Sequence, residues 1–446
     1  MSHKWIIIII LVASIAVHFA YFGQPNETVF DEVHFGKFVS GYYTGEYYFD
    51  IHPPLGKLMI AGFANLFDFQ PEYSFVNIGD KFPDNKYLVL RFLPALAGTL
   101  LPLVIFLLLS ELGMSRTAAF AGALLVVFDN ALLTQSRLIL LDPFLLLFGF
   151  TSLLFYFKKK YLLMAIFGGF AISIKWTGLS FIALPIAIES YEKFRDLLTN
   201  LSYDRFVSSV LDLAKFASFF IMSLAIYFSV FAAHFALLPK PGSGDAFMKP
   251  EFQGNNIVKN VWDLNIEMYK SNQRLGATHP YSSQWYTWPL MIRPIFYWVK
   301  DTARIYFLGN PVIWWASTVA VITALLLTVY RLLPKLKNHE LSSVVSSPLA
   351  FLVLGYVLNL LPFIGVKRVM FLYHYLTALI FAIMILCYLI DKNPFDKLRA
   401  RKNSRKVFTG IIIAAIAAFL FFAPLSYGLS LSQRAYEARV WFASWR

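Results

Sequence analysis

Apolar residues along this chain gather into long runs, separated by short basic loops and by two long polar stretches. About twenty apolar residues are needed for a helix that crosses a membrane, and with that length as a guide we predict eleven crossing helices. Their approximate limits are 5–22, 87–110, 117–133, 138–157, 161–174, 176–190, 213–237, 307–330, 347–364, 369–390 and 407–427. The fifth and sixth runs are short, and only Lys175 divides them.

The short loops predict the orientation of these helices. Basic residues cluster at 158–160, at 331–337 and at 392–406, where there are seven Lys or Arg, and all three clusters fall on one side of the predicted map. Because basic loops favour the cytoplasm, that side and the N-terminus are predicted to be cytoplasmic. The two long polar stretches, residues 23–86 and 238–306, then share the extracytoplasmic face with the C-terminus.

Composition agrees with this pattern and excludes a soluble domain. The 446 residues are 58% hydrophobic and only 15% charged, and their mean hydropathy is +0.60. The net charge of +13 comes largely from the basic loops, so it indicates topology rather than nucleic-acid binding. Cys387 is the only cysteine and lies in an apolar run, which excludes a disulfide framework and a thiolate metal site.

Two short helices are predicted inside the first polar stretch. The segment EVHFGKFVSGYYTG, residues 32–45, has an apolar face suited to the membrane interface. The segment PPLGKLMIAGFANLF, residues 53–67, begins with two prolines, which a first helical turn tolerates. Residues 279–298 of the second stretch are rich in Trp, Tyr and Pro, a composition typical of a membrane surface.

An acidic pair, Asp31 and Glu32, lies about nine residues after the first run, near the outer interface. A carboxylate at this position can deprotonate a hydroxyl group if its surroundings raise its basicity. Adjacent helical residues point about 100° apart, so one reactive and one supporting carboxylate is the simplest assignment. The alternative is structural, with Asp31 capping a helix whose first turn contains Glu32.

Basic residues near the same interface are candidates for binding a phosphate. His52 precedes the two prolines and Lys57 lies one helical turn further on, which suits phosphate binding but also a plain interfacial turn. Arg91 lies near the outer end of the second run. Charges in apolar segments are costly and usually paired or functional, so Arg137 is either functional or paired with Asp142.

Motifs for metal and nucleotide binding are absent from the sequence. His279, His374 and the acids lack HExxH spacing, and neither a Walker A sequence nor GxGxxG is present. We therefore predict no cofactor and no metal site, although the sequence neither requires nor excludes a divalent metal.

Several motifs together resemble the dolichyl-phosphate-mannose–protein O-mannosyltransferase family. They are FDEVHFGKFVSGYYTGEYYFDIHPPLGKLMIAG, NIGDKFPDNKYLVLRF, SRLILLDPFLLLF, HPYSSQWYTWPLMIRP, GNPVIWW and RVMFLYHYL, and they cover nearly the whole chain in family order. Each motif alone is only suggestive, whereas DE, HPPLGK, SRxILLD and FLYHY in these positions are specific in combination.

The resemblance implies a GT-C type membrane fold in one catalytic domain, residues 1–446, with eleven helices and an extracytoplasmic active site. It implies transfer of mannose, with inversion, from a polyprenyl-phosphate or dolichyl-phosphate carrier to Ser or Thr hydroxyls of proteins. Asp31 matches the family's catalytic base and Glu32 its supporting neighbour. We expect the donor phosphate or substrate to be bound by basic residues in the family motifs, namely His52, Lys57, Arg91, Arg137, His279 and His374.

The second polar stretch departs from the eukaryotic pattern. Eukaryotic members carry a β-trefoil MIR domain before the eighth helix, and residues 238–306 are too few to hold it. We therefore expect a prokaryotic member in a plasma membrane. Its expected partners are the bilayer, the lipid-linked donor and Ser/Thr-containing proteins, without nucleic acid, and both a homodimer and a heterodimer stay open.

Two other functions compete with this interpretation. Another GT-C transferase that delivers a lipid-linked sugar to a lipid or glycan would share the acidic outer loop, but it is not expected to keep HPPLGK together with FLYHY. A transporter would place its charged residues along a path through the membrane. No inverted repeat is evident, and polar residues concentrate in the two long stretches, which disfavours the transporter.

Overall fold

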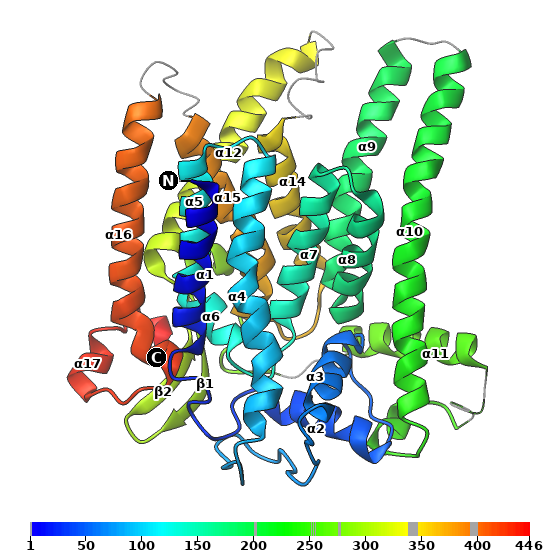
Figure 1. Cartoon of the computed structure of the whole chain (residues 1–446), viewed down its shortest axis with the longest axis vertical. Helices are drawn as coiled ribbons and strands as arrows, with labels where there is room; N and C mark the ends of the chain where they lie inside the picture. Colours follow the sequence, from blue (N-terminus) through cyan, green and yellow to red (C-terminus); the bar gives the residue numbers. More distant parts are fainter. Residues whose placement is uncertain are drawn as a thin grey trace.

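The structure, a computed structural model, describes residues 2–199, 203–250, 252, 254, 256–274, 278–337, 347–392 and 400–446. Long helices form a bundle, and shorter elements gather at one of its ends (Figure 1). The bundle contains α1 (His3–Phe19), α4 (Tyr87–Glu111), α5 (Arg116–Val127), α6 (Asn130–Ser136), α7 (Asp142–Phe157), α8 (Tyr161–Ile174), α9 (Ser180–Thr199), α10 (Tyr203–Leu237), α12 (Pro311–Lys337), α14 (Pro348–Leu360), α15 (Leu376–Lys392) and α16 (Ala400–Tyr427).

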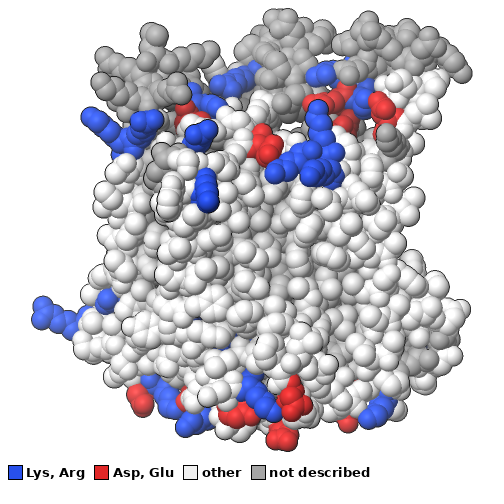
Figure 2. All heavy atoms as spheres, in the orientation of Figure 1, with Lys and Arg blue, Asp and Glu red and all other residues white. Residues whose placement is uncertain are grey.

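Within the described ranges, six helices are long and apolar enough to cross a membrane, namely α4, α10, α12, α14, α15 and α16. The bent pair of α5 and α6 makes a seventh if it is counted as one span, and α1, α7 and α8 are shorter apolar helices. Lys, Arg, Asp and Glu side chains gather mostly at the two ends, with a largely uncharged band between them (Figure 2). The predicted all-α, polytopic membrane architecture is confirmed.

Several predicted helix limits are wrong, and three of the differences have a clear local reason. The run 117–133 bends by 58° between α5 and α6, where the Asp129 carboxylate accepts the N–H groups of Ala131 and Leu132 and starts a new helix. α7 begins at Asp142 rather than 138, with Pro143 in its first turn. α12 begins at Pro311, because residues up to Phe307 form a β-strand.

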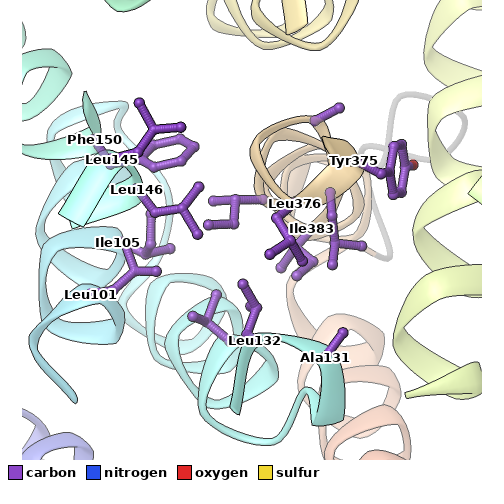
Figure 3. Packing of buried hydrophobic residues seen from close by; sticks show 14 of the residues in the cluster. Leu101, Ile105, Ala131, Leu132, Leu145, Leu146, Phe150, Tyr375, Leu376 and Ile383 are labelled. Carbon is purple, nitrogen blue, oxygen red and sulfur yellow. The ribbon is translucent and has the colours of Figure 1, made fainter. Parts of the chain in front are cut away.

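The core of the bundle is aliphatic and aromatic. Side chains from α4, α6, α7 and α15 point toward one another at its centre (Figure 3). They include Leu101, Ile105, Leu132, Leu145, Leu146, Phe150, Leu376 and Ile383. α15 is deeply buried in this core, whereas α10 and α16 are largely exposed on the outside, as expected for helices that face lipid.

The two long polar stretches lie at the same end of the bundle, as the predicted map requires (Figure 1). The first forms α2 (Glu32–Thr44) and α3 (Leu55–Asn65), so both predicted interfacial helices are present. The second forms α11 (Ile257–Arg274) and an antiparallel hairpin of β1 (Ile295–Lys300) and β2 (Ala303–Phe307). The hairpin was not predicted. Near it lies the short helix α17 (Gln433–Glu437).

Candidate active site

A buried ion pair fastens the first polar stretch to the bundle. Nε and Nη2 of Arg91 each donate to one oxygen of the Glu32 carboxylate, both at 2.7 Å, and both side chains are fully buried. The carboxylate also accepts the backbone N–H groups of Val29 at 2.8 Å and Ile139 at 3.0 Å. Glu32 is thereby committed to holding α4 and the turns before α2 and α7 together.

Every side-chain N–H group of Arg91 donates a hydrogen bond to a protein oxygen. Besides Glu32, Nη1 donates to the carbonyl oxygens of Gly23 at 3.0 Å and Pro25 at 2.7 Å, and Nη2 donates to that of Glu27 at 2.8 Å. An arginine has five N–H donors, so no donor of Arg91 is left for a phosphate in this structure. We propose that Arg91 positions the loop, in place of the phosphate role expected from the sequence.

Asp31 is the residue immediately before α2, but its side chain forms no capping hydrogen bond with the helix. No hydrogen bond joins its carboxylate to the described part of the chain. Burial raises the pKa of Asp31 to about 7, and Asp142 and Asp50 act in the same direction, while Lys175 and Arg368 oppose the shift. A half-buried, unpartnered carboxylate with this pKa is suited to take up a proton near neutral pH.

Lys175 is the first basic group near Asp31, and the sequence analysis did not select it. It lies in an extended conformation between α8 and the 3₁₀ turn Trp176–Leu179. Its Nζ donates to Oδ1 of Asp142 at 2.8 Å, and Nε2 of Gln135 donates to Oδ2 at 2.6 Å. The pairing of Asp142 with Arg137, one of the two alternatives that the sequence left open, is therefore wrong. The lone charge that interrupts two short apolar runs was the signal for Lys175.

Arg368 is the second basic group that acts on Asp31, and the sequence analysis missed it as well. Its Nη2 donates to Nε2 of His374 at 3.2 Å. The His374 ring stacks on Trp288, with centroids 5.8 Å apart. Nothing in the sequence RVMFLYHYL distinguished Arg368 from a basic residue at the end of a helix.

His52, Asp50 and Lys57 lie together around the start of α3. Lys57 is 1% exposed, forms an ion pair with Asp50 and donates to the His52 carbonyl oxygen at 2.9 Å. Burial lowers the pKa of His52 well below its usual value, and the charges of Lys175 and Arg368 add to this, so the ring is neutral.

Two candidates from the sequence lie outside this group of residues. Arg137 donates to the carbonyl oxygens of Ala20 and Tyr21, and its guanidinium lies 4.5 Å from the centroid of the Tyr427 ring. These contacts tie the end of α1 to α16. His279 is exposed, and its ring lies 5.1 Å from that of Phe371.

The arrangement combines one free carboxylate with three cationic side chains, Lys57, Lys175 and Arg368. Such a site can accept a proton and stabilise an anion that forms beside it. Within the described ranges, no group of three or more His, Cys, Asp or Glu side chains could hold a metal ion.

Comparisons with known proteins were made at the level of sequence and of structure. The profile "Dolichyl-phosphate-mannose-protein mannosyltransferase" matches residues 8–239. The profile "C-terminal four TMM region of protein-O-mannosyltransferase" matches residues 257–445. Dolichyl-phosphate-mannose–protein mannosyltransferase 4 of Schizosaccharomyces pombe is 34% identical over 306 residues, which are 62% of this chain and 39% of the relative. Protein O-mannosyl-transferase 2 of Danio rerio is 30% identical over 307 residues, which are 64% of this chain and 40% of the relative.

These aligned regions are about two fifths of each curated relative's length. Among solved structures, the Saccharomyces cerevisiae Pmt1–Pmt2 complex bound to the sugar donor matches with a TM-score of 0.87 at 20% identity, covering 99% of this chain and 92% of that one. ArnT from Cupriavidus metallidurans bound to undecaprenyl phosphate matches with a TM-score of 0.55 at 14% identity, covering 96% and 77%. At these identities, the two structures show a shared membrane fold.

Proposed function

We propose that this chain transfers mannose from a polyprenyl-phosphate carrier to Ser or Thr hydroxyls of proteins. The premise is that the chain belongs to the dolichyl-phosphate-mannose–protein mannosyltransferase family. The observation that carries the proposal is the Asp31 carboxylate, which has no hydrogen-bond partner among the described residues. Its pKa is raised to about 7, and the charges of Lys175 and Arg368 act on it. The acceptor hydroxyl needs a base that takes its proton, and the departing lipid phosphate needs cations that stabilise its charge.

The proposed reaction is a single displacement. The acceptor hydroxyl oxygen attacks the anomeric carbon of mannose while its proton passes to the Asp31 carboxylate. The bond from that carbon to the phosphate oxygen breaks, and its electron pair leaves with the carrier phosphate. Attack from the opposite face inverts the anomeric configuration. Lys57, Lys175 and Arg368 stabilise the phosphate dianion, so no separate general acid is needed.

The pH dependence of transfer follows from the Asp31 pKa. Below about pH 7 the carboxyl is protonated and cannot act as the base. We therefore expect kcat/KM to fall as the pH drops through about 7, on an acid limb that corresponds to one proton. Initial rates of mannosyl transfer between pH 5 and 9 measure this limb. A rate that stays flat down to pH 5, as an aspartate with the ordinary pKa of 3.8 would give, would contradict the assignment.

The cations are expected to affect use of the donor. Lys175→Met and Arg368→Met each remove a group that can bind phosphate, so KM for the lipid donor is expected to rise about tenfold or more. KM for the acceptor peptide is expected to change little. The matched control is Lys37→Met, which removes an exposed lysine from α2. Equal donor KM values in the three variants and the parent would refute the phosphate role.

The membrane setting is also part of the proposal. The chain is a multi-pass membrane protein, and we propose that the end carrying α2, α3 and the hairpin is extracytoplasmic. The basic residues 158–160, and the ends of α12, α15 and α16 that adjoin the other basic clusters of the sequence, lie at the opposite end of the bundle. We propose the plasma membrane of a prokaryote as the location. The yeast complex contains Pmt1 with Pmt2, which supports the proposal that this chain also works as a dimer.

One assay decides between this function and its nearest rival. The purified full chain is incubated with mannosyl-phospho-polyprenol and a Ser/Thr-rich peptide, and any added hexose is located by mass spectrometry. Hexose on a Ser or Thr side chain is the expected result. Transfer to lipid alone would instead support a GT-C transferase with a lipid acceptor.

A further inference from the structure

The residue before Asp31 has an unusual backbone conformation. Phe30 has a φ angle of +48°, which lies in the left-handed region that residues other than glycine rarely adopt. Such a conformation costs free energy and persists only where surrounding contacts hold it. The conformation of Phe30 sets the direction in which the chain enters α2, and therefore where the Asp31 carboxylate points.

A close ring contact from the hairpin packs against Phe30. The rings of Phe30 and Tyr297 stack in parallel, with centroids 4.0 Å apart and planes 4° apart. The Tyr373 ring also contacts Phe30, edge-on and with the ring centroids 6.2 Å apart. Phe30 is 8% exposed, so water does not replace these contacts.

Tyr297 is itself held at two points, by its place in the hairpin and by its hydroxyl group. The pairing of β1 with β2 shifts between Phe296 and Trp298, so Tyr297 is the extra residue of a β-bulge. Bulges redirect a side chain and are common next to active sites. The Tyr297 hydroxyl donates to Oε1 of Gln135 at 2.7 Å, and Gln135 in turn donates to Asp142, the partner of Lys175.

We propose that Tyr297 is a positioning residue which, through the ring stacked on Phe30, holds Asp31 where it takes the acceptor proton. The inference rests on the function proposed above. It also gives the hairpin a role, because a residue of the second polar stretch orients the base contributed by the first. The Gln135 and Asp142 bonds connect the same tyrosine to Lys175, on the phosphate side.

Two substitutions separate the ring from the hydroxyl. Tyr297→Leu removes the stack, and we expect kcat to fall about tenfold or more with both KM values within about twofold of the parent, because a misplaced base slows the chemical step and not binding. Tyr297→Phe keeps the stack and is expected to retain most of kcat. The control is Tyr306→Leu, which removes an equally buried tyrosine whose ring packs on Phe296 instead.

Hydrogen–deuterium exchange provides a readout that does not need activity. The amides of Glu32 and Val33 are bonded to the carbonyls of Val29 and Phe30, and they should exchange faster in Tyr297→Leu than in Tyr306→Leu. Parent-like kcat in Tyr297→Leu, or an equal loss in Tyr306→Leu, would overturn the proposal. If Asp31→Asn keeps full transfer, the proposed base is wrong, while the exchange result still decides whether Tyr297 holds this turn.

Discussion

Replacing Asp31 with asparagine is expected to lower kcat for mannosyl transfer by about 10²–10⁴-fold, the usual contribution of a positioned general base. Asparagine has nearly the same size, so substrate contacts that depend on shape are kept. Its amide cannot take up the proton of the acceptor hydroxyl. The nearby Asp50 and Asp142 are already paired with Lys57 and Lys175.

The same substitution is expected to increase stability. The folded-state pKa of Asp31, about 7, lies above its ordinary value of 3.8, so the folded protein binds this proton more tightly than the unfolded chain. Stability is then lost as the pH rises from about 4 to about 7, where the half-buried carboxyl ionises without a hydrogen-bond partner among the described residues. Asparagine carries no charge, so the melting temperature of Asp31→Asn at pH 8 should exceed that of the parent.

The control for both measurements is Asp84→Asn, which changes an exposed acid in the same polar stretch. Its transfer rate and melting temperature should match those of the parent. Near-normal transfer by Asp31→Asn would remove this residue as the base. An inactive Asp31→Asn with a lowered melting temperature would mean that Asp31 supports the fold instead.

Hydrophobic runs predicted the helices because both lipid and a close-packed core require long apolar segments. This requirement does not depend on which other helices a segment packs against. The acidic pair was also recognisable, since two carboxylates beside a membrane need an explanation. The sequence did not show, however, which of the two carboxylates is structural. Glu32 is committed to Arg91 by contacts across 59 residues of sequence, and no local pattern encodes such a distance.

The cations of the site show the same limit. Lys175 interrupts an apolar run and was visible as an oddity, yet its proximity to Asp31 depends on how α8 packs. Arg368 lies in the motif RVMFLYHYL, but nothing local identified it as a site residue. The hairpin was hidden because IFYWVK and ARIYF are rich in aromatic residues that suit a membrane surface as well as a strand. Tyr297 reaches Gln135 across 162 residues, a contact that only the folded chain creates.

Replacing Arg91 with methionine is expected to destabilise the folded protein by about 3–5 kcal/mol, because it leaves the buried Glu32 carboxylate without its counter-ion. The carbonyl oxygens of Gly23, Pro25 and Glu27 also lose their donors. The melting temperature in detergent should fall by several degrees, and the yield of monodisperse protein should fall with it. Glu32→Gln keeps the shape of the side chain and should cost less.

The comparison variant is Glu111→Gln, which breaks an exposed ion pair with Lys158 at the other end of the bundle. A surface pair of this kind contributes about 0–1 kcal/mol, so its melting temperature should stay near that of the parent. The two roles considered for Arg91 then give opposite results. A positioning residue lowers stability and leaves donor KM unchanged in the molecules that stay folded. A phosphate-binding residue would give a stable protein with a raised donor KM, and that result would refute the positioning role.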